Sequence, residues 1–106
     1  MAYVNLNDLK EREVVPGFMG KFVHSKNMTI AHWKIKAGSV TPKHKHLQEQ
    51  VTIIIKGKLE LTVEEKVRTI LPNENAIIPA NVIHAAKAIT DCHVIDVFYP
   101  VREDYK

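Results

Sequence analysis

GSVTPKHKHLQEQVTIIIKG, residues 38–57 of this 106-residue chain, is the stretch from which the fold is inferred. Its two histidines, His44 and His46, are one residue apart, and Gln50 follows four residues after the second. Residues i and i+2 of an extended strand point to the same face, so both imidazoles are expected to face one cavity. Because neutral imidazole is the commonest metal ligand in proteins, this stretch predicts half of a metal site.

A second histidine signal lies in residues 78–84, IPANVIH. Pro79 fixes a turn that delivers His84 to the start of a following strand. If this strand lies beside the strand that contains Gln50, His84 joins the first two histidines. Three imidazoles and one amide oxygen then surround one divalent transition metal ion, either zinc, nickel, iron, manganese or copper. The alternative is that the three histidines have structural roles only.

The rest of the chain consists of short apolar segments separated by turns, and no segment of ten or more residues has the 3.6-residue period of a helix. This regular spacing predicts an all-β barrel or sandwich. Residues 50–56 are apolar on both faces, which indicates a strand buried on both sides. One face carries Val51, Ile53 and Ile55, and the other carries Gln50, Thr52 and Ile54. We therefore expect a homodimer in which a second subunit covers the outer face.

Composition excludes several classes of protein. A hydrophobic fraction of 45% with 25% charged residues is that of an ordinary globular domain. The chain contains no run of eighteen apolar residues, so the sequence predicts no membrane-spanning helix. The first fifteen residues contain no apolar signal-peptide core. The one cysteine, Cys92, forms no internal disulfide, which favours a reducing compartment. We expect a cytoplasmic protein.

The net charge of +3 is concentrated near the histidines. Residues 34–58 carry six lysines against the single acidic residue Glu49. These lysines are Lys34, Lys36, Lys43, Lys45, Lys56 and Lys58. They predict either solvated strand faces or a basic rim that attracts a small anion. No DNA-binding helix is recognisable, so nucleic acid is not the expected partner.

The spacing of these residues resembles the two motifs of single-domain cupins. The first motif is matched by Gly38, His44, His46, Gln50 and Gly57, and the second by Asn73, Pro79 and His84. Gln50 stands where most cupins place a glutamate, and Asn73 replaces a glycine at a turn that asparagine tolerates. The resemblance implies one domain over residues 1–106 with the jelly-roll, or double-stranded β-helix, barrel of the cupins. The barrel is expected over residues 28–100, with residues 1–27 contributing to the dimer.

The ending DVFYPVREDY, residues 96–105, resembles that of the KdgF-like cupins, as does the pattern His-x-His-x-x-Glu-Gln at 44–50. That group converts 4,5-unsaturated uronates into linear keto-sugar acids. The resemblance implies metal ligands at His44, His46, Gln50 and His84, active-site roles for Asp96 and Arg102, and a cavity wall at Phe98. We expect Trp33 to be a core or cavity-wall residue.

These residues are chemically consistent with a reaction on a sugar acid. Arg102 can bind a carboxylate through two hydrogen bonds, and Asp96 can act as general acid or base. The structural alternative is that Asp96 pairs with Arg102 and holds the tail. Two other functions stay open: a cupin dioxygenase, and a non-catalytic module that binds a small molecule.

Overall fold

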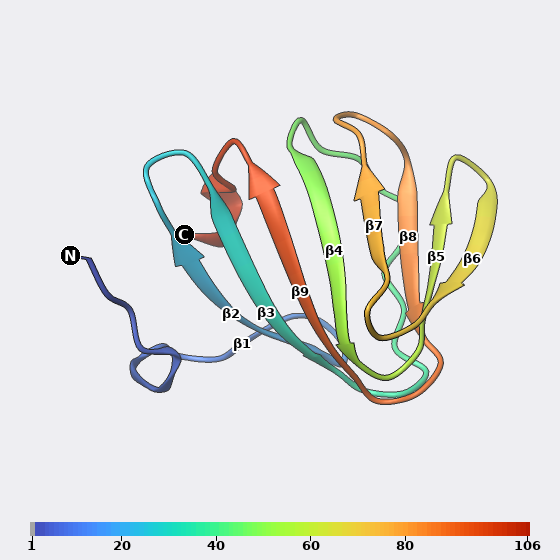
Figure 1. Cartoon of the computed structure of the whole chain (residues 1–106), viewed down its shortest axis with the longest axis horizontal. Coiled ribbons are helices and arrows are strands. Elements are labelled where there is room, and N and C mark those ends of the chain that lie inside the picture. Colours follow the sequence, from blue (N-terminus) through green and yellow to red (C-terminus); the bar gives the residue numbers. More distant parts are fainter. Residues whose placement is uncertain (1) are drawn as a thin grey trace.

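The computed structural model describes residues 2–106, which form nine β-strands and two short 3₁₀ turns (Figure 1). The strands are β1 (Arg12–Val15), β2 (Phe18–His24), β3 (Thr29–Ile35), β4 (Glu49–Lys56), β5 (Leu59–Val63), β6 (Lys66–Ile70), β7 (Asn75–Ile78), β8 (His84–Ala88) and β9 (Cys92–Tyr99). The 3₁₀ turns are η1 (Leu6–Asp8) and η2 (Glu103–Tyr105). Within residues 2–106, no helix is long and apolar enough to cross a bilayer.

The strands form two antiparallel sheets with the core between them. The larger sheet has the order β1-β2-β3-β9-β4-β7, and the smaller has the order β6-β5-β8. The inward alternation of β4 buries Gln50, Thr52 and Ile54, as the sequence predicted. The core also contains Phe18 and Trp33, which are each 5% exposed. The all-β, cupin-type fold is thereby confirmed.

The histidine stretch reaches its place differently from our expectation. Residues 38–46 are not a continuous strand but run along the free edge of β8, with isolated bridges such as that of His44 to His84. The backbones of His44 and His84 exchange two hydrogen bonds of 3.0 and 2.9 Å. Pro42 has no N–H to donate to such a pairing, which interrupts it. The condition under which the sequence brought His84 to the other histidines, a strand beside β4, is not met, because β8 pairs with β5 in the smaller sheet.

Two glycines and one asparagine allow the close contacts of this fold. Asn73 has a φ of 71°, which confirms the turn that the sequence predicted at this position. Gly57 has a φ of 93°, and a Cβ there would overlap the carbonyl oxygen of Asp91. Gly20 lies directly opposite Trp33 on β3, and a Cβ there would lie 2.7 Å from the indole. The missing side chain of Gly20 therefore leaves room for the indole.

The N-terminal strands belong to the same sheet as the rest of the chain. β1 pairs with β2, and β2 pairs with β3 over its whole length. Residues 12–24 therefore extend the larger sheet within the single chain. A contribution of residues 1–27 to a dimer stays a prediction, and residue 1 lies outside the described part of the chain.

Candidate metal centre

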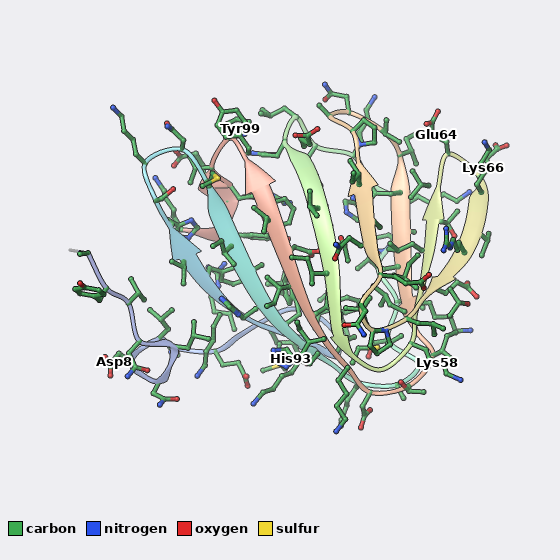
Figure 2. The ribbon with its side chains drawn as sticks, viewed as in Figure 1. Asp8, Lys58, Glu64, Lys66, His93 and Tyr99 are labelled. Atoms are coloured by element: carbon green, nitrogen blue, oxygen red, sulfur yellow. The ribbon has the colours of Figure 1, made fainter. Side chains whose placement is uncertain are left out.

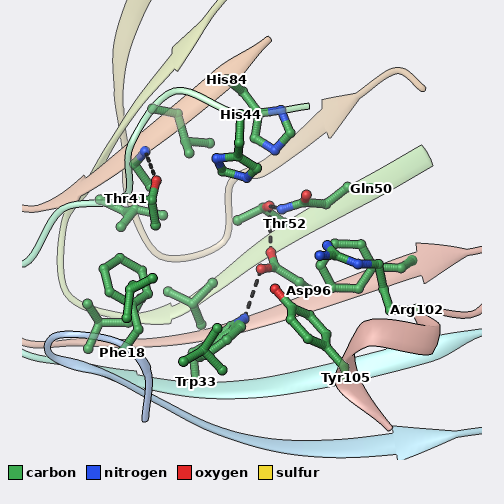
Figure 3. Close-up of a pocket in the computed structure, with 18 of the residues that line it drawn as sticks. Phe18, Trp33, Thr41, His44, Gln50, Thr52, His84, Asp96, Arg102 and Tyr105 are labelled. Atoms are coloured by element: carbon green, nitrogen blue, oxygen red, sulfur yellow. Dashed lines mark hydrogen bonds between the residues drawn. The ribbon is translucent and has the colours of Figure 1, made fainter. Parts of the chain in front are cut away.

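Three histidines from two parts of the chain meet in one cluster; two of them, His44 and His84, are visible in Figure 3. His44 and His46 come from the segment beside β8, and His84 is the first residue of β8. One ring nitrogen from each lies within 4.8 Å of the others. Gln50 reaches the same place from the beginning of β4 in the larger sheet. The predicted ligand residues are therefore brought together from both sheets.

Each imidazole is oriented by a backbone carbonyl. The Nδ1 atoms of His44, His46 and His84 lie 2.8, 3.0 and 2.8 Å from the carbonyl oxygens of Pro42, Gln48 and Val82. A carbonyl can only accept, so each Nδ1 carries the proton and donates it. The Nε2 lone pairs are then free to bind a metal. Such outer hydrogen bonds commonly fix the tautomer and ring orientation of metal-binding histidines.

Two observations show that these residues fit a cation. Nε2 of His84 is buried and has no hydrogen-bond partner within residues 2–106. Nε2 of His46 lies 3.0 Å from Oε1 of Gln50, although both atoms present lone pairs when the imidazole is neutral. Burial lowers the pKa of His84 to about 4 and also lowers the pKa of His46, so both rings are neutral at pH 7. Three nitrogens and one amide oxygen suit a divalent transition metal.

Asp96 is a buried carboxylate beside this cluster. Thr52 donates its hydroxyl proton to Oδ1 over 2.6 Å, and the indole N–H of Trp33 donates to Oδ2 over 2.9 Å. Burial raises the pKa of Asp96, whereas the hydrogen bonds from Thr52, Gln50 and Trp33 act in the opposite direction. Trp33 is thus more than a wall residue, because it holds one oxygen of the carboxylate.

Two histidines of the cluster, His44 and His84, line one cavity of about 190 Å³ between the sheets together with the carboxylate of Asp96. Its apolar walls include Phe18, Ile35, Leu59, Leu61, Val94 and Phe98. Its polar lining includes His44, Gln50, Thr52, His84, Asp96 and Arg102. Figure 3 shows Asp96 between the histidines and Trp33. The predicted wall residue Phe98 and both predicted catalytic residues therefore border the same space.

Arg102 pairs with a different carboxylate from the one considered in the sequence. Its Nε and Nη2 atoms donate to Asp104 over 2.9 and 2.7 Å. Its guanidinium carbon lies 4.8 Å from the ring centre of Phe98 and 4.1 Å from that of Tyr105. The alternative that Arg102 is ion-paired with Asp96 is wrong. Asp104 engages one edge of the guanidinium, so the other donors stay available to the cavity.

The C-terminal tail is tied to the larger sheet on both sides of Arg102. The Arg102 backbone N–H donates to Oγ1 of Thr29 over 2.9 Å. Nδ1 of His24 lies 2.8 Å from that same oxygen, and its Nε2 lies 3.2 Å from the Tyr105 carbonyl. Arg12 also donates to that carbonyl over 3.1 Å. His24 therefore has a structural role, because its ring connects β2 to the tail.

Gln48 links the tail to the histidine segment. Its side-chain amide donates to the carbonyl of Val101 over 3.1 Å, and its own carbonyl accepts from His46. The side chain is buried, with the residue only 7% exposed. One residue thus fixes both a metal-site imidazole and the segment that leads to Arg102.

Of the two interpretations of the six lysines, a basic rim around the histidines does not hold for all of them. Lys34, Lys36 and Lys56 line a separate cavity together with His93. Gln50 is near the beginning of β4 and Lys56 is at its end, which places them about 20 Å apart at the rise of a strand. Lys58 and His93 lie at one end of the molecule and Tyr99 at the other (Figure 2). The lysines lie far apart because successive residues of a strand point to opposite faces and because each strand carries the chain along the molecule. A count of net charge over a stretch of sequence includes neither effect.

Four residues near the site had not been recognised from the sequence, namely Gln48, Thr52, Asp104 and Tyr105. Thr52 could have been found, because it has the same strand parity as Gln50. The contacts of the others depend on where the tail crosses the cavity, for which the sequence carries no local signal.

Comparison with known proteins agrees with this geometry. Residues 31–98 match the family Cupin_2, described as a cupin domain. An uncharacterized protein of Streptomyces coelicolor is 26% identical over 102 residues, covering 94% of this chain and 97% of the relative.

Solved structures with the same fold include the structure of KdgF from a Halomonas species. It has a TM-score of 0.92 and 26% identity, covering 100% of this chain and 99% of that one. An RmlC-like cupin from Shewanella frigidimarina has a TM-score of 0.93 at 19% identity, covering 100% of this chain and 96% of that one. Oxalate decarboxylase from Bacillus subtilis aligns with 92% of this chain but only 29% of its own length, at 16% identity and a TM-score of 0.83. The latter two similarities concern the fold alone.

Proposed function

This chain belongs to the Cupin_2 family, and from that premise we propose that it is a metal-dependent enzyme acting on a small sugar acid. The proposed reaction is the ring opening of a 4,5-unsaturated uronate to its linear keto form. Likeness to KdgF over the whole chain supports the choice of this group within the family. The metal ligands are His44, His46, Gln50 and His84.

The observation that carries the proposal is the position of Asp96. Asp96 is 9% exposed as a residue and lines the same cavity as His44, His84 and Arg102. Burial raises its pKa toward the range in which a carboxyl group can both release and accept a proton. A purely structural carboxylate would be expected to pair with the neighbouring cation, but that cation is held by Asp104. Asp96 is therefore our candidate general acid and base.

The chain's residues can divide the chemistry between them. A bound divalent ion would supply Lewis acidity and a template for the oxygen atoms of the sugar acid. The free donors of Arg102 would bind the substrate carboxylate, with Phe98 beneath the guanidinium. Asp96 in its protonated form would give its proton to the double-bond carbon that does not carry the ring oxygen, so that positive charge develops on the other carbon and on the ring oxygen.

The Asp96 carboxylate would then accept a proton from water as the hydroxyl adds to the carbon that carries the ring oxygen, which restores the acid. The product of this addition is a hemiketal. Its bond from the hydroxyl-bearing carbon to the ring oxygen breaks, the hydroxyl proton is lost and the ring oxygen gains one. The result is a ketone, so water is the only co-reactant that the sequence of steps consumes.

The test is the loss of ultraviolet absorbance of an unsaturated uronate when it is mixed with the metal-loaded protein. We expect turnover that Asp96→Asn lowers by about 10²–10⁴-fold, the contribution of a general acid or base, while metal content is unchanged. Arg102→Lys should raise KM, and Glu103→Gln is the control on an exposed neighbouring carboxylate. Tight binding of the uronate without turnover would instead indicate a binding module, and oxygen uptake would indicate a dioxygenase.

A further inference from the structure

We propose that Thr52 is a positioning residue that orients the Gln50 amide toward the metal and dictates that this ligand is glutamine rather than glutamate. The inference rests on the proposed metal site and Asp96 role. It concerns one hydroxyl group that lies between the two. Thr52 is 1% exposed, so no solvent molecule can readily replace its contacts.

The direction of each hydrogen bond follows from the donors available. Oγ1 of Thr52 lies 2.6 Å from Oδ1 of Asp96 and 2.9 Å from Nε2 of Gln50. A hydroxyl has a single proton, and the short distance to Asp96 is typical of a bond from a hydroxyl to a carboxylate. The hydroxyl oxygen must then accept its second hydrogen bond. In the described part of the chain, the side-chain amide of Gln50 supplies that bond.

An amide satisfies this requirement and a carboxylate does not. The Gln50 NH₂ group donates to Thr52, which turns Oε1 toward His46 and the proposed metal position. A glutamate here would present a second acceptor to a hydroxyl whose proton is already used. The result would be a buried acceptor without a donor, which costs free energy. The departure of Gln50 from the common cupin motif is therefore explained by its neighbour.

The backbone register makes the arrangement rigid. Thr52 and Asp96 are direct partners across β4 and β9, and Gln50 is two residues earlier on the same face of β4. Trp33 holds the far oxygen of the carboxylate. The two hydrogen-bond partners of Thr52, Gln50 and Asp96, thus lie on strands that are each paired with a neighbour on both sides. Neither residue can therefore move to compensate for the loss of the Thr52 hydroxyl.

The test compares Thr52→Val, which keeps the shape and removes the hydroxyl, with Thr52→Ser, which keeps the hydroxyl. Cobalt affinity is measured by competition with a chelator, and the visible spectrum of the cobalt complex reports the ligand field. We expect Thr52→Val to weaken binding at least tenfold, as for other outer-sphere partners, and to change the spectrum. Thr52→Ser should match the wild type. Thr69→Val, at an exposed position of β6, is the matched control.

The metal-free protein gives a second readout. The side-chain amide resonances of Gln50 should shift in Thr52→Val and stay in place in Thr52→Ser. Unchanged cobalt affinity, spectrum and amide resonances in Thr52→Val would overturn the inference, as would equal losses in Thr52→Ser. Neither readout uses a uronate. If cobalt binds as expected but no uronate is turned over, the proposed function fails and the inference about Thr52 stands.

Discussion

His46 and Gln50 face each other across 3.0 Å with two atoms that both present lone pairs, Nε2 and Oε1. The histidine's only proton is engaged by the carbonyl of Gln48 on the other side of the ring. Two acceptors at hydrogen-bond distance repel unless a positive centre lies beside both. The pair therefore has the charge arrangement of a cation site, and the neighbouring Nε2 of His84 completes it.

The first prediction concerns metal content. Protein purified and loaded with zinc or cobalt should bind one ion per chain, and His44→Ala should lose it because one of the converging nitrogens is removed. Elemental analysis after dialysis measures this. His93→Ala is the matched control, since His93 lies at the other end of the molecule (Figure 2). Unchanged metal content in His44→Ala would contradict the site.

The second prediction concerns the pH dependence of the metal-free protein. His84 has a pKa of about 4 in the folded chain and an ordinary value of 6.5, so the unfolded chain binds more protons between these values. The contribution of His84 to the free energy of unfolding should therefore be complete above pH 6.5 and be lost as the pH falls toward 4. The difference of pKa corresponds to about 3 kcal/mol.

Urea unfolding at a series of pH values, with chelator present, measures this loss. His84→Gln should flatten the dependence in part, because His46 has a lowered pKa and acts in the same direction. Stability that increased on acidification over this range would contradict the prediction.

The third prediction concerns Asp104. Its carboxylate holds Nε and Nη2 of Arg102 but is itself 61% exposed, so the pair contributes at most about 1 kcal/mol. Asp104→Asn should therefore raise KM for a uronate about threefold to fivefold and leave kcat nearly unchanged. Steady-state kinetics separates the two constants. A fall in kcat with constant KM would show that Asp104 acts on the chemical step.

The fourth prediction concerns Gly20. An alanine Cβ there would lie 2.7 Å from the Trp33 ring, which cannot retreat without disturbing its bond to Asp96. Gly20→Ala should lower the free energy of unfolding by about 1–3 kcal/mol, the usual cost of overpacking. Urea denaturation measures it. The cost should shrink in a Trp33→Leu background, and stabilisation by Gly20→Ala alone would refute the clash.

The fifth prediction is the homodimer. The outer face of the larger sheet presents a row of half-buried apolar side chains, with Ile53 directly opposite Ile95 and the neighbouring Ile77 70% exposed. Light scattering should give twice the mass of one chain, and Ile53→Lys should give a monomer. Val67→Lys, on the smaller sheet, is the control. A monomeric wild type would show that this face stays open to solvent.

Local sequence patterns predicted most of the strands and the three histidines that converge in the structure. Alternation located β4 and its inner face, and Asn73 marked a left-handed turn that the structure confirms. Which strands pair with each other was harder to predict from the sequence, because the apolar pattern of β8 is compatible with pairing in either sheet. The histidines converge although the condition assumed for this, a strand beside β4, is not met.

Long-range contacts of polar side chains account for what the sequence could not reveal. Asp104 is two residues from Arg102, but nothing local distinguishes it from Asp96 as the partner of the guanidinium. The lysines were grouped by sequence distance, whereas β4 carries the chain to the far end of the molecule before it turns at Gly57. Residues close in sequence thus separate, and residues such as Gln48 and Val101 meet.

The contact of Gln48 with Val101 has a consequence for protein engineering. A segment carrying the two histidines and Gln50 could be grafted onto another barrel by matching the motif alone. The acceptor for Gln48 would be missing unless the recipient's tail followed the same path. The transferable unit is therefore two pieces of chain rather than one, and a graft of both should retain ligand geometry that a graft of the motif loses.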